Sequence, residues 1–156
     1  MRVKLCFLLL VFGLSVEIFA SACSVEATLG ESVDSIESDR AALSATRGTA
    51  TAQDGYTVHE VNYDSTTVRE YVSSSGIVFA IAWNGLVRPD LTQLLGSYAG
   101  EYQKALEQTA REPGRRRLRV KTDKVVVEHW GHMRNLQGRA YVPALIPPGV
   151  STNEIR

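Results

Sequence analysis

Glu60 and Glu70 are the residues of this sequence whose type and surroundings best suit acid–base chemistry. Val58 lies two residues before Glu60, and Val68 and Val72 lie two residues to either side of Glu70. A carboxyl group among apolar neighbours has a raised pKa and can act as a general acid. If the two segments pair as strands, the glutamates could form the catalytic pair of a small hydrolase. The alternatives are exposure at the strand ends or a structural ion pair with Arg69, Arg88 or Arg139.

Three histidines raise the possibility of a metal site. His129 and His132 have H-x-x-H spacing, which on a helix would place two ligands together. A third ligand would have to come from His59 or Glu128. However, Gly131 and the valines before His129 predict a strand that runs into a turn. We therefore expect two histidines beside a turn and no metal site.

Motifs for nucleophilic catalysis and cofactor binding are missing from the sequence. There is no G-x-S-x-G, no P-loop and no G-x-G-x-x-G. The two cysteines, Cys6 and Cys23, are both close to the N-terminus, so a catalytic Cys–His pair is not expected. The sequence predicts no cofactor and favours a protein that is not an enzyme.

Arginines are concentrated in the last third of the chain. The 17 basic and 17 acidic residues balance overall, but residues 111–156 contain 10 basic and 4 acidic residues. The densest group could contact an anionic partner such as lipid head groups or an acidic glycan. The alternative is a solvated loop that balances the acidic half of the domain. No aromatic residue interleaves the group, so we expect no nucleic acid. Its members are Arg115, Arg116, Arg117 and Arg119.

A second candidate binding surface combines arginines with aromatic residues, the side chains that dominate recognition hot spots. Its members are Arg69, Tyr71, Trp83, Arg139 and Tyr141. The alternative is that the aromatic residues belong to the core and the arginines close the edge of a sheet.

The N-terminal residues predict a secretory signal peptide. Two basic residues precede an apolar run over residues 5–14, and small residues follow over 20–22. The run is about half the length of roughly 20 residues that a bilayer requires. We expect residues 1–27 to be removed and residues 28–156 to form one domain, located in the periplasm or cell envelope.

The cleavage position decides whether the protein is anchored. A cut before Thr28 removes both cysteines, whereas a cut before Cys23 leaves one and therefore no internal disulfide. Ala20-Ser21-Ala22 before Cys23 resembles a bacterial lipobox, in which the cysteine thiol is acylated. Acylation of Cys23 would anchor the protein to a membrane.

Alternating apolar residues predict a sheet. Strands are expected over 56–63, 67–73, 77–83, 118–121, 124–130 and 136–142. The third strand is apolar on both faces, which predicts a central position. In it, Ile77, Phe79, Ile81 and Trp83 are expected to share one face.

Two helices complete the predicted fold. The longer covers residues 90–110, with Asp90 as N-cap, and Gly96 inside it predicts close packing or a bend. The shorter covers about 33–46, followed by a small, polar linker over 47–54. The predicted class is α+β: an antiparallel sheet of about five or six strands, with one long and one short helix packed on it.

Four segments together resemble a bacterial family catalogued as domain of unknown function 2844. They are VREYV at 68–72, GIVFAIAW at 76–83, PDL through LLG at 89–96 and GRAYVP at 138–143. The resemblance extends from about residue 28 to the C-terminus. It implies a small exported protein, chiefly proteobacterial, with a signal peptide and no assigned activity or ligand residues. Relatives begin near Ala-Leu-Gly after cleavage, which favours the cut before Thr28.

These observations favour a non-catalytic binding or assembly module of the bacterial periplasm or cell envelope. Its partner would be an envelope protein or an anionic surface component, with membrane contact only if Cys23 is acylated. The alternatives are a periplasmic hydrolase that uses Glu60 and Glu70, and a lipoprotein anchored through Cys23.

Overall fold

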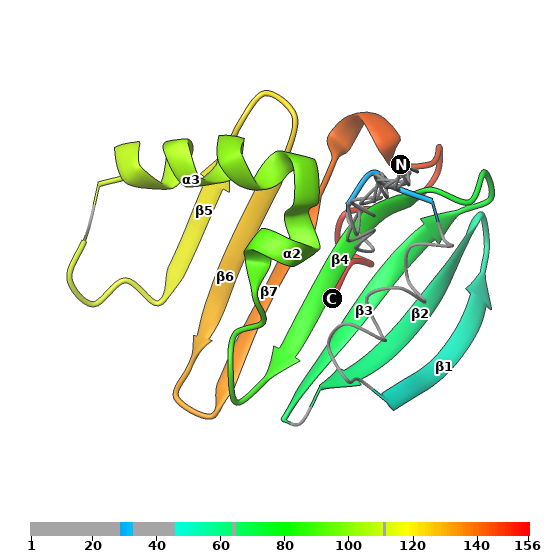
Figure 1. The fold of residues 1–156 in the computed structure, drawn as a ribbon, viewed down its shortest axis with the longest axis horizontal. Coiled ribbons are helices and arrows are strands. Elements are labelled where there is room, and N and C mark those ends of the chain that lie inside the picture. Colours follow the sequence, from blue (N-terminus) through cyan, green and yellow to red (C-terminus); the bar gives the residue numbers. More distant parts are fainter. Residues whose placement is uncertain (1–28, 33–45, 64, 111) are drawn as a thin grey trace, which may run out of the picture.

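The structure, a computed structural model, describes residues 29–32, 46–63, 65–110 and 112–156. Its centre is an antiparallel sheet of seven strands in the spatial order β1-β2-β3-β4-β7-β6-β5 (Figure 1). The strands are β1 (Thr46–Gln53), β2 (Tyr56–Tyr63), β3 (Thr66–Ser73), β4 (Val78–Gly85), β5 (Arg117–Lys121), β6 (Val126–His132) and β7 (Asn135–Tyr141). Helices α2 (Leu91–Leu95) and α3 (Ala99–Gln108) cross one face, so the predicted α+β class is confirmed.

The sheet has one strand more than the upper predicted number. The linker prediction for residues 47–54 is wrong, because Thr46–Gln53 forms β1 and pairs with β2, with Thr51 opposite Val58. β1 is an edge strand of the sheet, and its side chains from residue 49 to 53 are exposed. An edge strand with exposed side chains needs only backbone hydrogen bonds to one neighbour, so no apolar pattern marks it.

Some predictions fall on residues that the structure does not describe. These are the signal peptide, its cleavage site and the short helix over 33–45. Thr46, the last residue of that predicted helix, belongs to β1 instead.

Strand β4 occupies the predicted central position, between β3 and β7, and its residues 78–83 are all buried. One expectation about it is wrong, because Phe79 does not share a face with Trp83. Tyr71 pairs with Ala80 and Val72 pairs with Val78, which leaves Phe79 as an extra residue. Such a bulge interrupts the alternation, so Phe79 and Ala80 face the same side.

The long helix predicted over 90–110 is interrupted. Asp90 caps α2 as predicted, because its Oδ1 accepts a hydrogen bond from the Thr92 backbone N–H at 2.8 Å. Gly96 has a φ of 47°, and a 3-10 turn over Gly96–Tyr98 separates α2 from α3. The bend expected at this glycine is therefore confirmed.

Both faces of the central strands are covered. On the helix face, α2 and α3 bury Leu94, Leu95 and Tyr102 against the sheet. On the opposite face, called the tail face, Leu145, Ile146, Val150 and Ile155 of the C-terminal segment pack against the sheet, and Ile155 is completely buried. The proline-rich end of the chain is therefore the second layer of the core.

A prediction concerns Gly138, which lies opposite Trp83 in the β4–β7 pairing. A Cβ at this position would overlap the Trp83 ring and lie 2.7 Å from the Glu128 carbonyl oxygen. We expect Gly138→Ala to lower the free energy of unfolding by about 1–3 kcal/mol in urea titrations, because the core has no room for the methyl group.

The matched control is Gly100→Ala on α3, where a Cβ has open space. This substitution is expected to raise the free energy of unfolding by up to about 1 kcal/mol through helix propensity. Equal effects of the two substitutions would contradict the packing assigned to Gly138.

Candidate functional site

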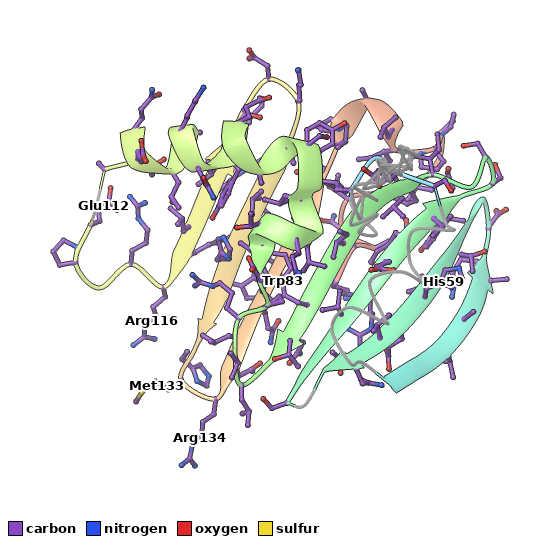
Figure 2. The ribbon with its side chains drawn as sticks, viewed as in Figure 1. His59, Trp83, Glu112, Arg116, Met133 and Arg134 are labelled. Atoms are coloured by element: carbon purple, nitrogen blue, oxygen red, sulfur yellow. The ribbon has the colours of Figure 1, made fainter. Side chains whose placement is uncertain are left out.

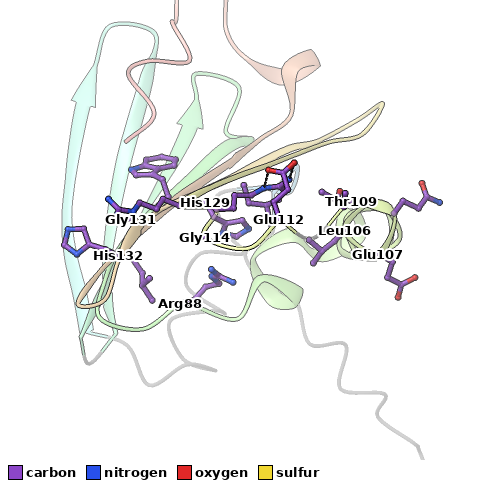
Figure 3. A pocket seen from close by; sticks show the side chains of 16 residues that line it. Arg88, Leu106, Glu107, Thr109, Glu112, Gly114, His129, Gly131 and His132 are labelled. Atoms are coloured by element: carbon purple, nitrogen blue, oxygen red, sulfur yellow. Dashed lines mark hydrogen bonds and ion pairs between the residues drawn. The ribbon is translucent and has the colours of Figure 1, made fainter.

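A groove of about 1120 Å³ lies beyond the end of α3 (Figure 3). Helix α3 ends because Thr109 adopts an extended backbone, with its hydroxyl donating to the Ala105 carbonyl at 2.8 Å. Strands β6 and β7 continue beyond the part of the sheet that α3 covers (Figure 1). The helix-face side chains of Leu118, His129 and Leu136 line the groove there.

The groove has a basic border. Three arginines and two glutamates line it. Arg115 is paired with Glu112, at 2.9 Å between Nη2 and Oε1. The other two arginines are Arg88, which follows β4, and Arg116, which immediately precedes β5 (Figure 2). Both are exposed, and neither makes an ion pair with any residue that the structure describes. Two guanidinium groups are therefore available to an anion.

His129 is the buried titratable residue of the groove. It is 5% exposed, and its Nε2 lies 3.0 Å from the Tyr102 hydroxyl. Its Nδ1 is buried and has no hydrogen-bond partner in the part of the chain that the structure describes. Burial, and then the positive charge of Arg88, lowers the pKa of His129 to about 4, so the imidazole is neutral at pH 7. Burial also raises the pKa of Tyr102, which keeps its hydroxyl protonated.

The tail face of the same strands holds a buried carboxylate. The Glu128 side chain is 3% exposed and accepts a hydrogen bond from Arg139 Nε at 2.7 Å. Arg119 Nε lies 3.2 Å and Arg117 Nη2 lies 3.9 Å from its oxygens. The Arg139 guanidinium also lies over the ring of Trp130. A carboxylate can be buried here because three guanidinium groups surround it.

Arg139 also binds the C-terminal segment. Its Nη1 donates to the Thr152 carbonyl and, at 3.3 Å, to the Ile155 carbonyl. On β3, the Tyr71 hydroxyl lies 2.9 Å from the Arg156 carbonyl and accepts from the Arg156 N–H at 3.0 Å. The tail is thus held by polar groups from two strands as well as by its buried isoleucine.

The structure brings together four of the five residues of the arginine–aromatic surface. Arg69, Tyr71, Arg139 and Tyr141 lie on the tail face, where contacts with the C-terminal segment occupy three of them. Trp83 lies on the helix face and is 2% exposed. Contact of this set with a partner stays a prediction.

The basic group of the sequence is divided between the two faces. Arg115 and Arg116 line the groove, whereas Arg117 and Arg119 lie on the tail face beside Glu128. Arg117 and Arg119 share the tail face because side chains alternate along β5, whereas Arg115 and Arg116 precede the strand. The four arginines therefore do not form one patch.

The two glutamates of the proposed hydrolase are not brought together. Glu60 lies opposite Arg69, with 3.1 Å between their charged atoms, and Glu70 lies opposite His59. Because positions 60 and 59 point to opposite faces of β2, the glutamates lie on opposite sides of the sheet. The hypothesis of a catalytic pair is wrong for this geometric reason, and the structural ion pair of Glu60 is observed instead.

His129 and His132 lie on β6, as predicted. Because they are three residues apart on a strand, their side chains point to opposite faces of the sheet. Across the described ranges, no cluster of three or more His, Cys, Asp or Glu residues could hold a metal ion. None of the helices in these ranges has the length and apolar character to cross a membrane.

Sequence reasoning did not find the groove. Arg88 precedes α2, Leu106 is on α3, and Leu136 is the second residue of β7, so no local spacing connects them. The bond between Tyr102 and His129 likewise spans 27 residues. The packing of α3 across one end of the strands brings these residues together.

The fold is that of a small α+β protein with a groove beside its helix layer. Over residues 25–155, the chain matches the model of the family described as protein of unknown function (DUF2844). The chain therefore belongs to this family, as its motifs predicted. Neither a curated protein nor a solved structure matches it.

A prediction tests the buried ion pair. Arg139→Met is expected to lower the free energy of unfolding by about 3 kcal/mol or more, because it leaves the buried Glu128 carboxylate short of a partner. Arg69→Met is the control, because Arg69 also pairs with a glutamate and contacts the tail. It differs in burial, since both side chains of its ion pair are about one third exposed. Its loss should be about 1 kcal/mol or less. Equal losses in urea titrations would contradict the role assigned to burial.

A second prediction concerns pH. Folded His129 has a pKa of about 4, below the ordinary value of 6.5. Between these values the unfolded chain binds a proton that the folded chain excludes, so stability is lost as the pH falls from 6.5 to 4. The expected contribution of His129 is roughly 3 kcal/mol over this range.

The measurement is the free energy of unfolding at pH 7, 5.5 and 4. His129→Gln should flatten the dependence on pH, whereas His132→Gln, at an exposed position, should keep it. An unchanged slope in His129→Gln would show that other groups cause the dependence.

Proposed function

We propose that this protein is a non-catalytic binding module of the bacterial periplasm or cell envelope, and that it binds an anionic ligand in the groove beyond α3. The observation that carries the proposal is the pair of guanidinium groups, Arg88 and Arg116, that border the groove without an ion pair to any described residue. Charge-assisted hydrogen bonds from arginine are the usual means of binding carboxylates and phosphates.

Export is part of this proposal. Its support is the order of basic, apolar and small residues at the N-terminus. The structure is compatible with the cut before Thr28, because the next residue, Leu29, is completely buried and would be kept. Cleavage before Cys23 with acylation would give the same domain on a membrane anchor. Mass spectrometry of the mature N-terminus distinguishes the two forms.

The non-catalytic character is supported by the positions of the charged residues. Glu60 and Glu70 are on opposite faces of the sheet, and neither lines the groove. Glu112, which lines it, is paired with Arg115. His129, its buried histidine, already contacts the Tyr102 hydroxyl. The arrangement is better suited to holding an anion than to activating a nucleophile.

The test is a titration of the purified protein with sodium octanoate and with inorganic pyrophosphate, followed by NMR of backbone amides. We expect at least one anion to shift residues that line the groove. Arg116→Gln should weaken this binding about tenfold, because a charge-assisted hydrogen bond is lost.

The matched control is Arg117→Gln, at the next residue, whose side chain is on the tail face. It should change the affinity less than about twofold. If neither anion shifts the groove residues, or if the two variants lose affinity equally, the proposed function is wrong.

A further inference from the structure

We propose that the ligand of the groove is a single-chain amphipathic anion, with its acidic head group beside Arg88 and His129 and its hydrocarbon chain against Leu106, Leu118 and Leu136. This inference rests on the proposed function and narrows it to one class of ligand.

The apolar part of the groove supports the hydrocarbon chain. Leu106, at the end of α3, is 37% exposed, and Leu118 and Leu136 are half-buried on the sheet below it. Gly131 lies directly opposite Leu136, so no side chain covers that part of the floor. Three leucines around one groove favour a ligand that removes apolar surface from water.

The polar part of the groove supports the head group. His129 is 95% buried, and its Nδ1 has no hydrogen-bond partner among the residues that the structure describes, although buried polar atoms are nearly always bonded. When Tyr102 donates its hydroxyl proton to Nε2, Nδ1 carries the ring proton and can donate to an acceptor oxygen. An acidic oxygen that displaced the atoms covering Nδ1 would satisfy it.

Arg88 lies on the same side of the groove as His129. Both residues line the groove, and the positive charge of Arg88 contributes to the low pKa of His129. Figure 3 shows Arg88 and His129 on one side of the groove and Leu106 on the other. Leu118 lies directly opposite His129 in the β5–β6 pairing, so apolar and polar contacts adjoin one another, as a head group with an attached hydrocarbon chain requires. A volume of about 1120 Å³ lies slightly above the range of roughly 300–1,000 Å³ that is usual for small-molecule sites.

The experiment compares acetate, hexanoate and octanoate by isothermal titration of the purified protein, with 1-octanol as the uncharged probe. We expect affinity to rise with chain length, so that octanoate binds at least about tenfold more tightly than acetate. The uncharged 1-octanol should bind more weakly than octanoate, because it offers no charge to Arg88.

Substitutions test the apolar contacts and the charged contacts separately. Leu106→Gln should weaken octanoate binding at least about fivefold and leave acetate unchanged. Leu86→Gln is the control, because Leu86 is an exposed leucine that does not line the groove. Arg88→Gln should weaken all three carboxylates.

The outcomes separate this inference from the proposed function. If acetate or pyrophosphate binds as tightly as octanoate and Arg116→Gln weakens it, the amphipathic ligand is wrong while anion binding stands. If no anion binds, both are wrong. Binding to phosphatidylglycerol vesicles without binding of octanoate in solution would also overturn the single-chain ligand, because the source would be a membrane surface.

Discussion

The ion pair between Glu128 and Arg139 is the interaction on which the sheet and the tail both depend. A carboxylate removed from water costs several kcal/mol unless charges of opposite sign replace its hydration. Glu128 meets this requirement because Arg119 and Arg139 are its direct neighbours on β5 and β7. A shift of one residue in either pairing would move an arginine to the other face, so the ion pair also fixes the register. Through Thr152 and Ile155, Arg139 then extends this constraint to the C-terminal segment.

The groove lies on the face of β5–β7 opposite to the Glu128 ion pair. Because side chains alternate along β5–β7, placing the arginines beside Glu128 on the tail face leaves Leu118, His129 and Leu136 on the helix face. Helix α3 crosses these strands at one end only, and the sheet surface that it leaves uncovered becomes the floor of the groove. Structural and candidate binding roles are thus divided between the two faces of three strands.

The residues that were predicted correctly share a local cause. The alternation of apolar and polar residues predicted six of the seven strands. The capping residue Asp90 marked the start of the helix, and Gly96 marked its bend. The errors share a different cause. β1 is stabilised by pairing at an edge and not by its own side chains, and the reversed face of Phe79 depends on a bulge in its pairing with β3. Neither pairing can be read from the strand itself.

The sequence alone determined the family, through the four motifs that resemble it. It also determined the α+β class and the order of most elements, because these depend on short-range periodicity and on turn and cap residues. The tertiary structure decided which charged residues meet. It placed Glu60 and Glu70 on opposite faces, divided four neighbouring arginines (115, 116, 117 and 119) between the two sides of the sheet, and brought Arg88 into one groove with His129, 41 positions further along the chain. The physical reason is that the strand register and the position of α3 on the sheet are set by the packing of the whole sheet, which no local pattern encodes.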